Sequence, residues 1–220
     1  MNVVVGVVIG AVMAPSVYLL ATLLLKSSKR IPRMLITLWV ACIAAGIAIT
    51  TYASTTMAAG AVTTRGIATG IAYALFAVGI LAAALVDIVE RRIPNLITYP
   101  LIAIGVLGLP WLTQPTTGWA LAAPLLGATV SGVIGLLNAV LADQGLGDVK
   151  LAIAVGAWMA HLGLVAWAAG VLLGQLLMIG AVANTQIRRR RAGLPPDYTP
   201  LGPSLAGGAV LAVALAGLQI

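Results

Sequence analysis

Two of the five acidic residues are the first candidates for chemistry, because they adjoin long apolar segments of this sequence. Asp87 follows the apolar segment that ends at Val86, and Asp148 precedes the one that begins at Leu151. A carboxylate near a bilayer costs free energy, up to about 2.5–3.5 kcal/mol toward the bilayer centre. A lone aspartate at a helix end is usually a cap or an interface anchor, so neither residue identifies a site by itself.

The residues before Asp148 favour a functional interpretation. Gly145-Leu146-Gly147-Asp148 places two glycines directly ahead of the acid. Glycine adopts backbone conformations closed to other residues, and it lets another chain approach closely. A protease inside a membrane needs such an approach, because its substrate must lie extended beside the catalytic carboxyl. With a second acid at a matching depth, the motif indicates a site that contains Asp87 and Asp148.

The composition predicts a membrane protein. Of the 220 residues, 61% are hydrophobic and 8% are charged, and the mean hydropathy is +1.11. Ordinary soluble domains are about 45–50% apolar and about 25% charged, so these few charges could not cover a water-exposed surface. The net charge of +7 would suggest a nucleic-acid partner in a soluble protein, but here the positions of the charges indicate topology instead. We expect a single all-helical, membrane-embedded domain over residues 1–220, with no nucleic-acid partner.

Charged and proline-rich segments divide the chain into about eight apolar helices, each close to the 20 or so residues that span a bilayer. A turn is expected at His161-Leu162-Gly163, which makes the sixth span short. The expected spans lie near 2–25, 34–54, 67–86, 96–112, 120–142, from Val149 to that turn, from the turn to 187, and 201–219.

The placement of charge predicts the orientation of these spans. With eight crossings and an external N-terminus, 11 of the 12 basic residues lie on the cytoplasmic side and Arg65 alone lies outside. We expect the protein in the plasma membrane, with all five acids on the cytoplasmic side. Arg91, Arg92 and the run Arg188 to Arg191 are interpreted as topology anchors, and Glu90 as the partner of a nearby arginine.

Four stretches of the chain resemble those of one family, the prepilin leader peptidases, which are membrane aspartic proteases of the Gly-x-Gly-Asp class. Asp87 with Ile93-Pro94-Asn95 is similar to the family's first catalytic segment, and residues 145–151 are similar to the second. Gly156-Ala157-Trp158 resembles the glycine–tryptophan stretch that follows, and residues 199–206 resemble the C-terminal segment. The similarity covers roughly residues 67–210.

The resemblance implies that Asp87 and Asp148 form a catalytic pair. Like charges a few ångströms apart cannot both ionise easily, so such a pair holds one proton. The ionised carboxyl would activate water, and the protonated one would polarise the scissile carbonyl. Gly145 and Gly147 would shape the loop that admits the substrate. Lys150 would either bias the ionisation of the pair or act as a positive charge that sets the membrane topology.

The implied substrate is a type IV prepilin-like membrane protein with a short basic leader ahead of one apolar helix. Asp143 and Asp197 are expected in loops on the same side. We favour the interpretation that they are simply solvated over the alternative that they attract the basic leader. Many members of the family carry two Cys-x-x-Cys pairs, but Cys42 is the only cysteine here, so we expect no metal and no cofactor. Methylation of the new N-terminus and the oligomeric state stay open.

Three other interpretations stay open. A proton-coupled transporter could use paired carboxylates and glycine breaks, although such proteins often show paired repeats and midplane acids. A structural subunit of a secretion machine could carry the same acids only as helix ends. A different membrane aspartic protease would share the mechanism and cut other substrates. Proton-coupled uptake that depends on the acids, without peptide cleavage, would favour the transporter, and full function after Asp148→Asn would favour the structural subunit.

Overall fold

The computed structural model describes residues 2–25, 42, 46, 64–113, 118–142, 145–195 and 199–218. Throughout these ranges the regular secondary structure is helical, which confirms the expected all-helical fold. The helices are α1 (Asn2–Leu24), α3 (Thr64–Glu90), α4 (Asn95–Ala103), the π-helical turn η1 (Ile104–Gly108), α5 (Leu109–Thr113), α6 (Gly118–Ala142), α7 (Leu146–His161), α8 (Leu164–Arg191) and α9 (Gly202–Leu218).

Seven of the eight expected spans coincide with helices, and the expected span over 34–54 lies almost wholly outside the described residues. Four segments are long and apolar enough to cross a membrane: Ala68–Glu90, Asn95–Leu112, Leu121–Val140 and Leu164–Arg191. Helices α1 and α9 contain shorter apolar segments, and α7 has only 16 residues. The described part of the chain therefore supports a protein with several membrane-spanning helices, while the count of eight crossings stays a prediction.

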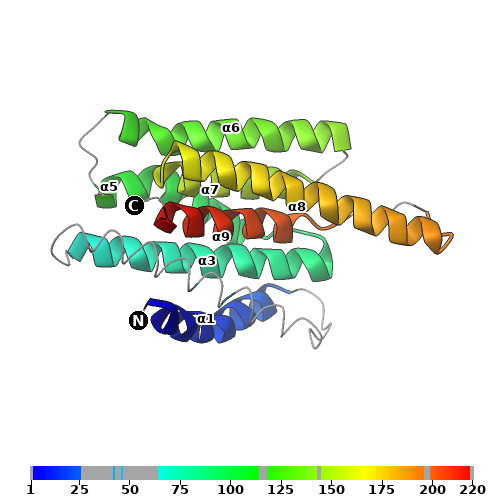
Figure 1. Ribbon diagram of the computed structural model, residues 1–220, viewed down its shortest axis with the longest axis horizontal. Coiled ribbons are helices and arrows are strands. Elements are labelled where there is room, and N and C mark those ends of the chain that lie inside the picture. Colours follow the sequence, from blue (N-terminus) through cyan, green and yellow to red (C-terminus); the bar gives the residue numbers. More distant parts are fainter. Residues whose placement is uncertain are drawn as a thin grey trace.

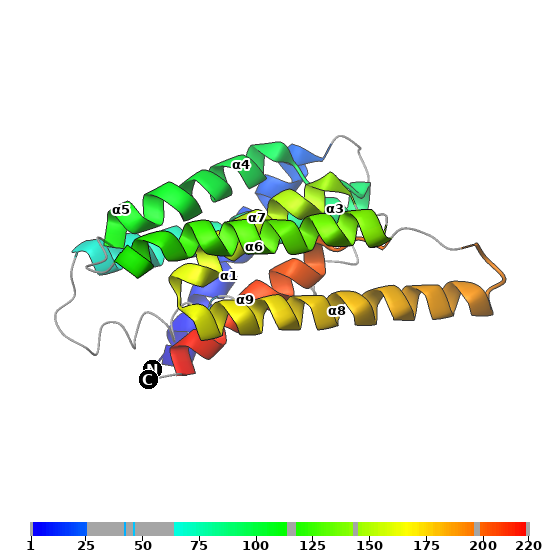
Figure 2. The ribbon, with the colours of Figure 1, turned by 90° about the horizontal axis from the view of Figure 1, so that it is seen from above.

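The helices lie side by side, and from α3 onward the chain reverses direction from one helix to the next, with α4, η1 and α5 forming one continuous stretch (Figures 1 and 2). Helices α1, α3, α6 and α8 end on the right in both views, where α4, α7 and α9 begin. This end carries Arg91, Arg92, Lys150 and the run Arg188 to Arg191, whereas Arg65 lies in the first turn of α3 at the opposite end. The described basic residues are thus segregated as the sequence predicts for a membrane protein.

A tight turn separates α7 from α8, as expected at His161-Leu162-Gly163. Helix α7 ends at His161 and α8 begins at Leu164. Gly163 has a φ of 119°, a backbone conformation that side chains rarely allow and that glycine adopts without strain. This turn sends α8 back toward the basic end of the bundle, so it fixes the direction of the last two helices.

Trp158 of α7 holds three parts of the bundle together. Its ring stacks on Phe76 with centroids 4.5 Å apart and meets the edge of Tyr73 at 5.2 Å, which ties α7 to α3. Its indole N–H donates to the carbonyl of Leu101 at 2.8 Å, in α4 just before the π-helical turn. A Cβ at Gly105 would lie 2.7 Å from the indole, so glycine is what admits the ring there. Buried Trp thus finds a polar partner, as it usually does.

Helices α6 and α7 approach each other through glycine on both sides. A Cβ at Gly156 would overlap the carbonyl of Gly127 and the side chain of Ser131, and a Cβ at Gly127 would overlap the carbonyl of Gly156. Small residues at helix crossings let backbones pack closely in membrane proteins, where no hydrophobic effect drives helices together. This crossing therefore sets the position of α7 relative to α6.

Replacement of Gly156 by alanine is expected to lower the thermal midpoint of the purified protein in detergent by several degrees. The added methyl overpacks the α6–α7 crossing, a change that costs about 1–3 kcal/mol. Gly180→Ala on α8 is the matched control, because nothing lies within 4 Å of a Cβ at that position. Equal midpoints for the two variants would contradict the close crossing.

Candidate active site

Asp87 is buried in the last turn of α3, with 1% of its surface exposed. Its Oδ2 accepts a hydrogen bond of 2.9 Å from the backbone N–H of Gly202, the first residue of α9. The first N–H groups of a helix lack partners within the helix and carry partial positive charge, so they suit a carboxylate. A Cβ at Gly202 would lie 3.1 Å from the same oxygen, and glycine therefore permits this close contact.

Asp148 is buried in the first turn of α7, with 4% of its surface exposed. Its backbone N–H bonds to the carbonyl of Gly145, which precedes the helix. An acid in the first turn is favoured by the positive end of the helix dipole. The side chain lines a cavity of about 20 Å³, together with Leu201 and Leu205.

The two acids meet the start of α9 at adjacent residues. Gly202 binds Asp87, and the preceding Leu201 lines the cavity of Asp148. Both acids lie at the basic end of the bundle, one where α3 ends and one where α7 begins (Figure 1). Three sequence stretches that are far apart along the chain therefore converge at one place.

The segment Ile93-Pro94-Asn95 lies against the beginning of α7. A Cβ at Gly147 would lie 3.2 Å from the Cβ of Ile93, so this glycine leaves room for the isoleucine. Lys150 donates to the side-chain oxygen of Asn95 at 3.0 Å, and its ammonium lies 5.2 Å from the ring centroid of Tyr99. The stretches around the two acids thus contact each other twice.

These contacts refine the roles expected for the two glycines and the lysine. Neither glycine has the left-handed backbone allowed by the motif: Gly145 is extended, with a φ of −70°, and Gly147 lies within helix α7. At Gly147 it is the close approach of another segment that requires glycine, and that segment is Ile93. Lys150 contacts α4 through Asn95 and Tyr99. A substrate-binding role for Gly145, Gly147 and Lys150 stays a prediction.

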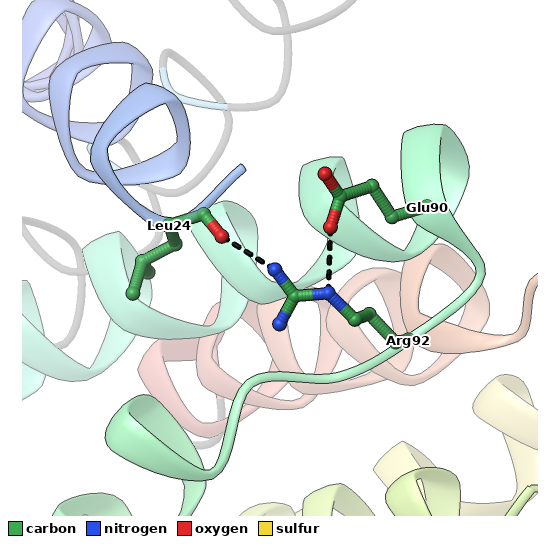
Figure 3. A network of polar contacts seen from close by, with 3 residues as sticks. All are labelled: Leu24, Glu90 and Arg92. Carbon is green, nitrogen blue, oxygen red and sulfur yellow. Dashed lines mark hydrogen bonds and ion pairs between the residues drawn. The ribbon is translucent and has the colours of Figure 1, made fainter. Parts of the chain in front are cut away.

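Arg92 connects the loop after α3 to the end of α1 (Figure 3). Its Nε lies 2.6 Å from a carboxylate oxygen of Glu90, which confirms the expected pairing of this acid with an arginine. A second guanidinium nitrogen donates to the backbone carbonyl of Leu24 at 2.6 Å. The sequence predicts that Arg92 anchors the topology. In the structure, Arg92 also connects α1 to the segment that follows Asp87 through hydrogen bonds.

Two amide side chains were not singled out by the sequence analysis, yet both line the cavity beside Asp148. Asn138 of α6 donates to the side-chain oxygen of Gln175 of α8 at 3.2 Å. The signal was present in the sequence, because Gln175 is the only amide between Leu164 and Ala183. Asp143 and Asp197 lie outside the described residues. Within the described ranges, no three side chains of His, Cys, Asp or Glu come together as a metal site would require.

A model of the type IV leader peptidase family matches residues 74–184, half of the chain. The chain belongs to this family. The match contains both buried acids and the glycine–tryptophan stretch, and it ends before the segment at the start of α9. Comparison with curated proteins and with solved structures found no match.

A double-mutant cycle tests the contact between Lys150 and Asn95. We expect Lys150→Met and Asn95→Ala each to lower the thermal midpoint by a few degrees, because a hydrogen bond to a charged group contributes about 1 kcal/mol when partly exposed. The double variant should lose no more than the worse single variant, since both changes remove one interaction. Arg190→Met, at an exposed position of the same end, is the control. Strictly additive losses would mean that the two residues do not interact.

Proposed function

We propose that this protein is an aspartic endopeptidase that removes the leader peptide of type IV prepilin-like precursors, with Asp87 and Asp148 as its two catalytic carboxyls. Family membership supports a leader peptidase role in general terms. The observation that carries the assignment of residues is the burial of both acids at the start of α9, from helices α3 and α7. Isolated helix caps at a surface would be exposed to water, whereas these two carboxyls are enclosed.

The proposed reaction uses the shared proton of the pair. One carboxylate takes a proton from water, and the water oxygen bonds to the scissile carbonyl carbon. The protonated carboxyl donates a hydrogen bond to the carbonyl oxygen as negative charge develops there. The carbon–nitrogen bond then breaks, and the leaving amine receives a proton from the pair. Water is consumed, and a carboxyl and an amine terminus are produced.

The proposed side of action is the cytoplasm, in a plasma membrane that the chain crosses about eight times. The basic residues at the end that carries both acids support this orientation. The proposed substrate has a basic leader followed by an apolar helix, so that cleavage falls at the membrane boundary. A proton-coupled transporter fits less well, because both acids lie near helix ends and not at mid-helix.

Replacement of either catalytic carboxyl should abolish cleavage. We expect Asp87→Asn and Asp148→Asn each to reduce leader removal by at least about 100-fold, because neither amide can serve as general base or acid. Cleavage is followed by mass spectrometry of the new N-terminus on a pilin precursor incubated with the purified protein. Asp143→Asn is the matched control and should retain substantial activity. Normal processing by both single variants of the pair would refute the assignment.

The orientation is testable by cysteine labelling from each side of the membrane. In a Cys42→Ser background, Leu164→Cys and Leu194→Cys place single thiols at exposed positions on opposite ends of the bundle. In intact cells whose outer envelope lets the reagent reach the plasma membrane, a membrane-impermeant maleimide should label position 164 alone. Position 194 should react only after the plasma membrane is opened. The reverse pattern would put both acids on the external side and overturn the proposed side of action.

A further inference from the structure

A small cavity with three polar side chains in its wall lies among α6, α7, α8 and α9 beside one of the two acids. It has a volume of about 20 Å³, and its polar lining consists of the side chains of Asp148, Asn138 and Gln175. The rest of its wall is formed by apolar residues and glycines of the same helices and by Leu201, which directly precedes α9. A water molecule needs about 10–15 Å³ when the volume is counted in this way, so the cavity has room for one.

The two amides are oriented toward each other in a way that leaves further hydrogen-bonding capacity. Asn138 Nδ2 donates to Gln175 Oε1 at 3.2 Å, which uses one donor and one acceptor. Beyond this bond, Asn138 keeps one N–H donor and its carbonyl oxygen, and Gln175 keeps both N–H donors of its amide group. A water in the cavity would thus meet a carboxylate acceptor together with amide donors and an acceptor. A buried water typically makes about three such bonds.

Both amides lie in mainly apolar stretches of their helices. Gln175 lies within the charge-free part of α8 among apolar neighbours, and an amide there is costly unless it has partners. The amide pair could serve only to join α6 to α8. The same two helices are joined a second time, because Trp167 donates to Ser131 at 3.1 Å, and neither residue lines this cavity. What distinguishes the amide pair is therefore its position beside Asp148.

We propose that Asn138 and Gln175 hold and orient the water that attacks the scissile bond. This inference rests on the proposed function and extends it. The amides fix the water oxygen so that a lone pair faces the carbonyl carbon while one water proton faces Asp148, the acid that lines the cavity. That proton passes to the ionised carboxyl as the oxygen–carbon bond forms, and the amine leaves with a proton from the other carboxyl. The amides exchange no proton, so their contribution is to geometry.

The test compares variants that remove the amides with one that removes the other α6–α8 hydrogen bond. Gln175→Met and Asn138→Leu keep the approximate size of each side chain and remove its polar atoms. Ser131→Ala removes the contact with Trp167 and leaves the cavity lining intact. The readouts are kcat and KM for cleavage of a pilin-type precursor with a basic leader, measured in nanodiscs, and the thermal midpoint of each variant.

We expect Gln175→Met and Asn138→Leu each to lower kcat by about 10- to 100-fold, because misplacement of a reacting group by about an ångström has effects of this size. KM should stay within about twofold, since substrate binding does not involve the water. The double variant should be no slower than the slower single variant, because the two amides act as a unit. Ser131→Ala should keep kcat within about twofold while its thermal midpoint falls as much as that of the amide variants.

Two results would overturn the inference: amide variants with the kcat of Ser131→Ala, or a Ser131→Ala variant as slow as the amide variants. The second result would show that the joining of α6 to α8 controls the rate. Failure of the inference is distinguishable from failure of the proposed function. If Asp87→Asn and Asp148→Asn are inactive while Gln175→Met is not impaired, only the water site is wrong. If those two aspartate variants remain active, the proposed function itself falls.

Discussion

The close packing of α7 is the constraint on which the rest of the site depends. Helix α7 is only 16 residues long, yet it crosses α6 with glycine against glycine and presses Trp158 against η1 at a third glycine. These contacts leave no space for side chains, so α7 has little freedom to slide or rotate. Asp148 in its first turn is consequently held inside the bundle and away from the surface, where most helix-capping aspartates lie.

Asp87 lies at the unfavourable end of its helix dipole, whereas Asp148 lies at the favourable end of its own. A carboxylate in the last turn of α3 lies at the negative end of that helix, and burial removes water that would otherwise stabilise it. The N-terminus of α9 offsets part of this cost by donating the N–H of Gly202. The cavity beside Asp148 and the amides across it give the second acid polar surroundings of a different kind. Such unequal surroundings would suit the division of base and acid roles in the proposed hydrolysis.

The segment after α3 joins the elements that carry these acids. Ile93 packs against Gly147, Asn95 binds Lys150, and Arg92 reaches the final carbonyl of α1. The stretches that resemble the family's first and second catalytic segments are therefore also contact surfaces for each other. Residues such as Asn95 and Lys150 do not need to touch a substrate to matter, because they hold the beginning of α7 in place.

Sequence alone was enough to predict the helical fold, the turn at Gly163, the segregation of basic residues and the choice of Asp87 and Asp148 as candidates. These features follow from apolar length, glycine conformation and charge placement, which act locally along the chain. Only the folded structure reveals the partner of Gly147, the hydrogen bond from Gly202 and the cavity with Asn138 and Gln175. Each joins segments from different helices, and hydropathy carries no information about which faces of those helices meet. The amide at Gln175 stood out in an apolar segment, but its relation to an acid on another helix became visible only once the helices were packed.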